Sequence, residues 1–173
     1  MSEHGFVDMD ETMVTGDARA MLVETRAQFG TIPPVVGRMA AAPALFRAFQ
    51  AGTAAFAATS LSVLEQETVI LTFARDVGCE VCVMMHQGLL AKAGGKDVAK
   101  SILARSPLDD PKLSALVAFT EDVVKTRGDV TPTVWETFLA AGFTRTQALE
   151  IVMGIGTYTM STYANRLTDG KLR

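Results

Sequence analysis

The stretch "LSVLEQETVILTFARDVGCEVCVMMHQGLLAKAG", residues 61–94, decides the fold. Ser62 and Glu65 have the spacing of a capping box, in which each side chain binds the backbone N–H of the other residue, so a helix is predicted to begin here. Gly78 is a typical helix terminator, and a second helix is predicted to begin at Cys79, directly after it. The stretch therefore predicts two consecutive helices joined by a tight turn.

The rest of the chain is predicted to be helical as well. No alternating strand pattern and no internal repeat is found in the sequence, and short connections favour antiparallel neighbours. We expect an all-α protein, an antiparallel helical bundle with a C-x-x-C at the start of a core helix. It is predicted to occupy residues 16–173, after an N-terminal tail or arm at residues 1–15. Further helices are predicted to start near Asp17, Pro33-Pro34, Ala44, Lys96, Asp110-Pro111, Thr131-Pro132 and Thr144.

Composition narrows the classes of protein. Of the 173 residues, 49% are apolar and 20% are charged, which is rich in apolar residues for a monomer and predicts a homo-oligomer. The formal net charge is −3 and no Lys/Arg-rich run occurs, so neither nucleic acid nor an anionic membrane is an expected partner. The acidic N-terminus lacks the features of a secretory signal, and we expect a cytoplasmic protein. In that compartment a cysteine pair is more often catalytic or metal-bound than a permanent staple.

Both cysteines and one of the two histidines lie within residues 79–86. Cys79, Cys82 and His86 fall at i, i+3 and i+7, which is a single helical face. The start of a helix favours a thiolate over a thiol, because unpaired N–H groups and the positive end of the helix dipole face it. His86 follows Cys82 by one turn, roughly 6 Å along the axis, so it can accept the thiol proton directly or through one water.

Glu67 is the second unusual residue of this stretch. It stands among apolar residues at the spacings of a core position, where a carboxylate is costly unless it is paired. Glu65 has a capping role, but no helix-capping role explains Glu67. If the two helices fold back on each other, Glu67 meets His86, and the alternative is an arginine from elsewhere in the chain. Its apolar neighbours are Val63, Leu64, Ile70, Leu71 and Ala74.

The combination of Glu67, Cys79-x-x-Cys82 and His86 resembles the signature of the alkylhydroperoxidase D-like branch of the carboxymuconolactone decarboxylase superfamily. The segments "LDDPKLSALVAFTEDVV", "AAGFTRTQALEIV" and "YANRLTDG" are similar to its downstream helices, so the resemblance covers most of the chain from about residue 17. It implies an all-helical fold that assembles into homotrimers or homohexamers. The decarboxylase branch lacks the cysteine pair, which argues against lactone decarboxylation here.

The resemblance also implies thiol-dependent reduction of hydroperoxides. By analogy, Cys82 is the attacking thiolate, Cys79 resolves the sulfenic acid to a disulfide, and Glu67 and His86 relay the proton. The expected reductant is a dithiol such as dihydrolipoamide or a thioredoxin-like protein, and no metal, flavin or haem is required. One position departs from the pattern, because relatives often carry Tyr, Trp or His where this chain has Val81, and an apolar side chain cannot hydrogen-bond a peroxide.

Two other interpretations use the same residues. In a disulfide reductase or electron adaptor for a separate peroxidase, Cys79, nearer the helix start, would be the attacking thiol. In a zinc-stabilised helical module, Cys79, Cys82 and His86 would be ligands, with Glu67 or His4 as the fourth. Three residues of the last predicted helix are further candidates to face the site: Tyr158, Tyr163 and Asn165.

Overall fold

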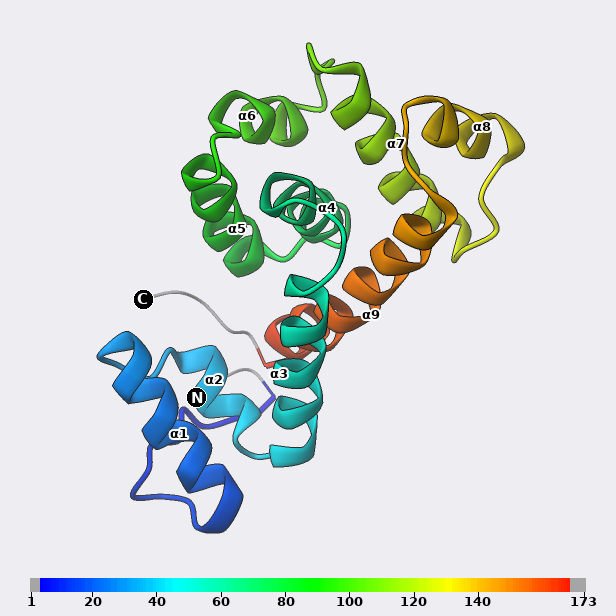
Figure 1. The fold of residues 1–173 in the computed structure, drawn as a ribbon. Helices are drawn as coiled ribbons and strands as arrows, with labels where there is room; N and C mark the ends of the chain where they lie inside the picture. The colour runs from blue at the N-terminus through cyan, green and yellow to red at the C-terminus, as the bar shows by residue number, and fades with distance from the viewer. Residues whose placement is uncertain (1–3, 169–173) are drawn as a thin grey trace.

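The structure is a computed structural model, and it describes residues 4–168 (Figure 1). All regular secondary structure in this part of the chain is helical, which confirms the predicted all-α class. None of the helices among the described residues is long and apolar enough to cross a membrane. The helices are α1 (Gly16–Phe29), α2 (Pro34–Met39), α3 (Pro43–Ala57), α4 (Val63–Asp76), α5 (Glu80–Lys92), α6 (Lys96–Ala104), α7 (Pro111–Thr126), α8 (Pro132–Ala140) and α9 (Arg145–Leu167).

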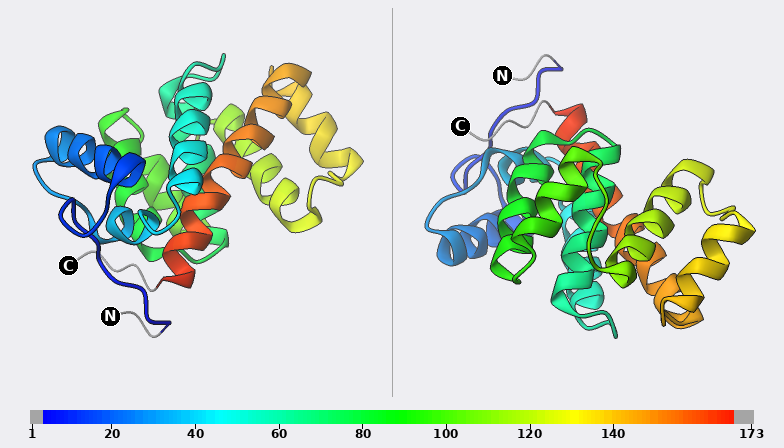
Figure 2. Two further views of the ribbon diagram at one scale, coloured as in Figure 1. Left: turned by 90° about the horizontal axis from the view of Figure 1, so that it is seen from below. Right: turned by 90° about the horizontal axis from the view of Figure 1, so that it is seen from above.

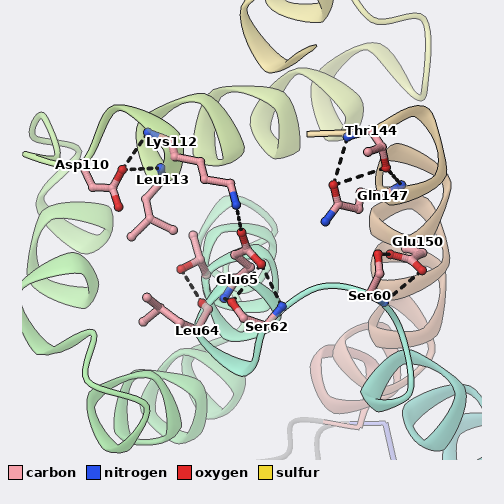
Figure 3. A network of polar contacts seen from close by, with 11 residues as sticks. Ser60, Ser62, Leu64, Glu65, Asp110, Lys112, Leu113, Thr144, Gln147 and Glu150 are labelled. Carbon is pink, nitrogen blue, oxygen red and sulfur yellow. Dashed lines mark hydrogen bonds and ion pairs between the residues drawn. The ribbon is translucent and has the colours of Figure 1, made fainter. Parts of the chain in front are cut away.

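Side-chain caps that the sequence predicts are present at the starts of α4, α7 and α9, and Figure 3 shows all three, whereas Thr131 at the start of α8 makes no side-chain cap hydrogen bond. At the start of α4, the Ser62 hydroxyl accepts from the Glu65 N–H at 3.3 Å while Glu65 accepts from the Ser62 N–H at 2.8 Å. Thr144 and Gln147 form the same reciprocal pair at the start of α9. Asp110 caps α7 by accepting from two backbone N–H groups. Each cap satisfies donors that a helix start leaves without intrahelical partners.

The cap of α4 also ties that helix to its neighbour α7. The Lys112 ammonium lies 2.7 Å from the Glu65 carboxylate, whose side chain is only 9% exposed. Burial raises the pKa of Glu65, but the hydrogen bonds from Lys112 and Ser62 outweigh it, so the pKa lies below the ordinary value. The contacts that cap α4 and join it to α7 therefore keep Glu65 ionised.

Helix α4 is the centre of the bundle, packed against α5, α7 and α9. Leu71 and Ala74 on this helix are fully buried. Helices α3 and α9 lie side by side, and Gly154 allows their close approach, because a Cβ there would stand 2.5 Å from the Phe56 ring. The two views of Figure 2 place α1 and α2 at one end of the molecule and α8 at the other. The cysteine-bearing helix α5 packs along the central helix.

The segment before α1 lies against the bundle as an arm. Asp8 forms an ion pair with Arg38 of α2 at 2.5 Å, and Arg38 donates a hydrogen bond to the Thr168 carbonyl after the end of α9. Glu11 pairs with Arg26 of α1 at 2.6 Å. The contacts of Arg38 with Asp8 and Thr168 link the end of α9 to the N-terminal part of the chain, and the Glu11–Arg26 pair links the arm to α1. Residues 1–3 and 169–173 lie outside the described part.

Candidate active site

The turn between α4 and α5 places Cys79 at the junction of two helices. Gly78 has a φ of 69°, a left-handed conformation that favours glycine. The Cys79 N–H donates to the Ala74 carbonyl at 3.0 Å and the Gly78 N–H to the Arg75 carbonyl at 3.1 Å, the two bonds of a Schellman motif. Cys79 is therefore both the last residue of this motif and the N-cap of α5.

The predicted start of the second helix is wrong by one residue, because α5 begins at Glu80. Cys79 has an extended backbone, with φ −94° and ψ 95°, and its sulfur accepts from the Cys82 N–H at 3.4 Å. Cysteine is not a usual N-cap, so the sequence did not signal this arrangement. The helix start acts on the Cys79 sulfur directly, through a backbone N–H that points at it.

The two cysteines form a disulfide, with Cα atoms 5.3 Å apart. Both residues are buried, Cys79 at 2% and Cys82 at 3% exposure. They share a small apolar cluster with Ala74 and Val81, so the residue that departs from the family pattern packs beside the sulfurs. The disulfide is therefore compatible with the buried positions of both cysteines.

Glu67 and His86 meet as the sequence predicts. The Glu67 carboxylate lies 2.8 Å from Nδ1 of His86, and the two side chains are 14% and 4% exposed. An ionised carboxylate only accepts, so Nδ1 carries the proton and Nε2 keeps its lone pair for another proton. The alternative partner for Glu67, an arginine, is not what the structure shows. The contact fixes the orientation of the imidazole and leaves Nε2 available to accept a proton.

The expected contact between His86 and Cys82 is not made directly. Within residues 4–168, no hydrogen bond joins His86 to either sulfur. His86 instead packs against Tyr158 of α9, edge to face, with ring centroids 5.1 Å apart. Burial, and secondly the negative charge of Glu67, raises the pKa of Tyr158 to about 12. The phenol is therefore neutral at physiological pH.

Among the described residues, the side chains that make polar contacts with the sulfurs come from α9. Nδ2 of Asn165 lies 3.4 Å from the Cys82 sulfur and 3.9 Å from the Cys79 sulfur, and the Thr162 hydroxyl lies 3.6 Å from the Cys82 sulfur. Arg166 donates to the carbonyls of Val77 and Gly78, both at 2.6 Å. The last turns of α9 thus hold the sulfurs and the turn that precedes them.

Sequence reasoning raised Asn165 and Tyr158 only as candidates, and it did not identify Thr162 or Arg166. Tyr163, the third candidate, is 57% exposed and lines a different pocket, of about 270 Å³, between α4, α7 and α9. The available signal was weak: Asn165 is the single asparagine of the sequence. Which face of α9 meets the cysteines depends on packing, and α9 carries no clear apolar stripe that would indicate it.

A metal centre fits this arrangement poorly. The two sulfurs are joined to each other in a disulfide, so neither is a free thiolate ligand. His4, offered as a fourth ligand, lies exposed in the N-terminal arm. No group of three or more His, Cys, Asp or Glu side chains in the described part of the chain is arranged to hold a metal ion.

The helical bundle around this site has the alkylhydroperoxidase D-like fold, which confirms the fold that the sequence resemblance implies. A crystal structure of an alkylhydroperoxidase AhpD core, an uncharacterized peroxidase-related protein from Ralstonia eutropha, matches with a TM-score of 0.83. The identity is 22%, over 97% of this chain and 91% of that one.

Two further solved structures share the fold. An uncharacterized peroxidase-related protein from Silicibacter matches with a TM-score of 0.78 and 17% identity, over 99% of this chain and 93% of that one. A protein of unknown function from Agrobacterium tumefaciens matches with a TM-score of 0.65 and 20% identity, over 76% of this chain and 91% of that one. No family model and no curated protein matches the sequence.

Proposed function

We propose that this protein reduces hydroperoxides with electrons from a thiol, through a Cys79/Cys82 dithiol–disulfide cycle in which Glu67 and His86 relay the proton. The observation that carries the proposal is the 2.8 Å contact between Glu67 and Nδ1 of His86, one helical turn after a disulfide-forming pair. A redox pair and an oriented base on one helix supply the two groups that peroxide reduction needs. The likeness in fold to two peroxidase-related proteins supports the same class of reaction.

With the hydroperoxide as oxidant and an external dithiol as reductant, the cycle balances. His86 takes the Cys82 proton through water, and the thiolate attacks the distal peroxide oxygen. An S–O bond forms, the O–O bond breaks, and the departing alkoxide takes the proton back from the imidazolium. The Cys79 thiol then attacks the sulfenic sulfur, so that a disulfide forms and water leaves. A dithiol such as dihydrolipoamide, or a thioredoxin-like protein, reduces the disulfide and is itself oxidised.

Assembly and location are part of the same proposal. Met84, Met85 and Leu89 on the outer face of α5 are 56%, 51% and 38% exposed, a degree of apolar exposure that favours burial between subunits. Together with the apolar composition, this supports a homo-oligomer, and the resemblance to alkylhydroperoxidase D-like proteins implies a homotrimer or homohexamer. A cytoplasmic location suits a cycle that depends on a reducing thiol pool.

The test is peptide mass spectrometry of the reduced protein after brief exposure to half an equivalent of cumene hydroperoxide. Both cysteines lie in one tryptic peptide, residues 76–92, so a disulfide appears as the loss of two hydrogens. Met84 and Met85 in the same peptide are an internal control, because methionine sulfoxide persists in dithiothreitol whereas the disulfide is reversed. Disulfide formation within seconds supports the proposal. Methionine oxidation ahead of disulfide formation would sink it.

A second candidate function, a disulfide reductase serving a separate peroxidase, is favoured by one contact. The Cys82 N–H points at the Cys79 sulfur at the helix start, which stabilises a Cys79 thiolate. The cysteine variants separate the two functions. Under the peroxidase proposal, Cys82→Ser abolishes peroxide consumption, whereas Cys79→Ser leaves a single turnover that ends at the Cys82 sulfenic acid. Wild-type protein that consumes no peroxide alone, but reduces a disulfide substrate in a reaction that Cys79→Ser abolishes, would favour the reductase.

A further inference from the structure

Asn165 is the polar residue closest to the reacting sulfur, and the proton relay does not use it. It is 5% exposed, and its Nδ2 faces both sulfurs, closer to that of Cys82 than to that of Cys79. Its Oδ1 is buried and has no hydrogen-bond partner among the described residues. A buried amide with an unsatisfied carbonyl destabilises a fold, so Asn165 calls for an explanation beyond packing.

The orientation of the amide follows from the chemistry of its neighbours. The sulfurs of a disulfide carry no proton, so they can only accept, and the NH₂ end of the amide must face them. A hydrogen bond to a neutral disulfide sulfur is weak. The same donor to a thiolate is charge-assisted and about twice as strong. The contact therefore gains most when Cys82 is reduced and ionised.

We propose that Asn165 binds the reduced Cys82 sulfur as a thiolate through Nδ2, with the Thr162 hydroxyl as a second donor. This inference rests on the proposed function for its purpose, since a bound thiolate is the species that attacks a peroxide. It rests on the structure for its geometry. The donors come from α9 and the sulfur from α5, so the two helices together make the thiolate site.

Other ionisable groups face this corner and must be separated from the effect. They are Cys79 itself, Glu67 from α4, His86 from α5, and Tyr158 and Arg166 from α9. The charged residues of α6, Lys96, Asp97 and Lys100, are exposed to solvent. Because a protonated His86 would also stabilise a nearby thiolate, the measurement is repeated in a His86→Gln background.

The experiment measures how fast iodoacetamide alkylates Cys82 in the fully reduced protein between pH 4 and pH 10. Alkylation at Cys82 is distinguished from alkylation at Cys79 by fragmenting peptide 76–92. Asn165→Leu keeps a similar volume and removes the donor, and we expect its alkylation midpoint about one pH unit or more above the wild type. Thr162→Val, nearly isosteric, should shift the midpoint upward by a smaller amount.

Controls keep the result specific. Thr159→Val changes a hydroxyl on the same helix that binds only the Ile155 carbonyl, and its midpoint should equal that of the wild type. If Asn165→Leu does not fold, as judged by circular dichroism, Thr162→Val and Asn165→Asp carry the test. Asn165→Asp replaces the donor by a carboxylate and should raise the midpoint further. In the His86→Gln background the shifts should persist.

The opposite result has a defined meaning. In the reduced protein the amide can turn so that Oδ1 accepts from a Cys82 thiol, which would stabilise the neutral form. In that case Asn165→Leu lowers the midpoint or leaves it unchanged, and the inference is overturned. Because alkylation needs no peroxide, the outcome is independent of the proposed function. If the midpoint shifts but the protein does not reduce peroxide, the thiolate site is supported and its proposed role in peroxide reduction is not.

Discussion

The carboxylates of Glu65 and Glu67, two residues apart on α4, have different surroundings. Glu65 accepts from the backbone and the hydroxyl of Ser62 and pairs with Lys112, so its contacts join a helix start to a second helix. Glu67 is also shielded, yet its polar partner among the described residues is the imidazole of His86. A carboxylate surrounded by fixed donors stabilises the fold, whereas one that pairs with an imidazole can support proton transfer.

The largest expected difference between Glu67 and Glu65 is in the rate of hydroperoxide reduction. Glu67→Gln should lower the rate of hydroperoxide reduction by about 100-fold or more, because the imidazole loses the acceptor that orients it as a base. Glu65→Gln, the matched change two residues away, should leave that rate within about twofold. The measurement is consumption of cumene hydroperoxide with dithiothreitol as reductant, after subtraction of the uncatalysed rate. Equal losses in the two variants would mean that Glu67 acts through the fold.

The cap that Ser62 forms with Glu65 should affect the stability of the fold and not the rate of hydroperoxide reduction. Ser62→Ala removes the capping hydroxyl of α4 and should reduce the free energy of unfolding by about 1 kcal/mol. For a chain of this length, that corresponds to roughly 2–4 °C in Tm. The check is urea unfolding of the reduced protein followed by circular dichroism. Peroxide consumption should be unaffected in folded protein, and a large loss of activity in Ser62→Ala would link the cap to the site.

A pH titration of stability sharpens the contrast further. Because the folded pKa of Glu65 is lowered, the unfolded chain binds the proton more readily, and the contribution of Glu65 is present above its ordinary value of 4.5. That contribution is lost as pH falls through the lower folded pKa. In urea unfolding from pH 3 to pH 6, the difference between wild type and Glu65→Gln should therefore shrink towards acid pH.

Two lysine changes act as controls for that titration. Lys112→Met should weaken the pH dependence, because Lys112 is one of the donors that hold Glu65 ionised. Lys125→Met, an exposed change on the same helix, should not. If the pH dependence of the free energy of unfolding is unchanged in Glu65→Gln, groups other than Glu65 cause it.

The smallest expected effect is at the ring beside the base. With its pKa raised to about 12, Tyr158 stays neutral below pH 10, so Tyr158→Phe should leave the pH profile of peroxide reduction unchanged in that range. Tyr158→Leu removes the edge-to-face contact with His86, worth about 1 kcal/mol, and should lower the rate modestly. Stopped-flow kinetics from pH 6 to pH 10 measures both. A new inflection in Tyr158→Phe would show that the phenol takes part in proton transfer.

What could be predicted from the sequence was local. The caps at Ser62, Asp110 and Thr144 define helix starts because their partners lie within three residues. The pairing of Glu67 with His86 was also accessible, because both residues lie on consecutive helices with a single glycine turn between them. Each of these predictions needed only periodicity and nearest neighbours along the chain.

The parts that escaped prediction depend on packing between distant segments. Asn165 reaches Cys82 across 83 residues of sequence, and no local pattern on α9 marks the face that does so. The role of Cys79 as an N-cap depends on the Schellman turn, which assigns one residue to the end of one helix and the start of the next. A sequence pattern placed Cys79 within one residue, but only the backbone conformation decided which side of the boundary it occupies.

The separation between Cys82 and Asn165 also sets an order of events during synthesis. At about 5–20 residues per second, a ribosome adds the 83 residues that follow Cys82, up to and including Asn165, in roughly 4–17 s. Throughout that interval the nascent chain already carries both cysteines, but the asparagine that contacts them has not been made. The thiols should then behave as unassisted cysteines, and they acquire their assigned environment only when the last helix docks.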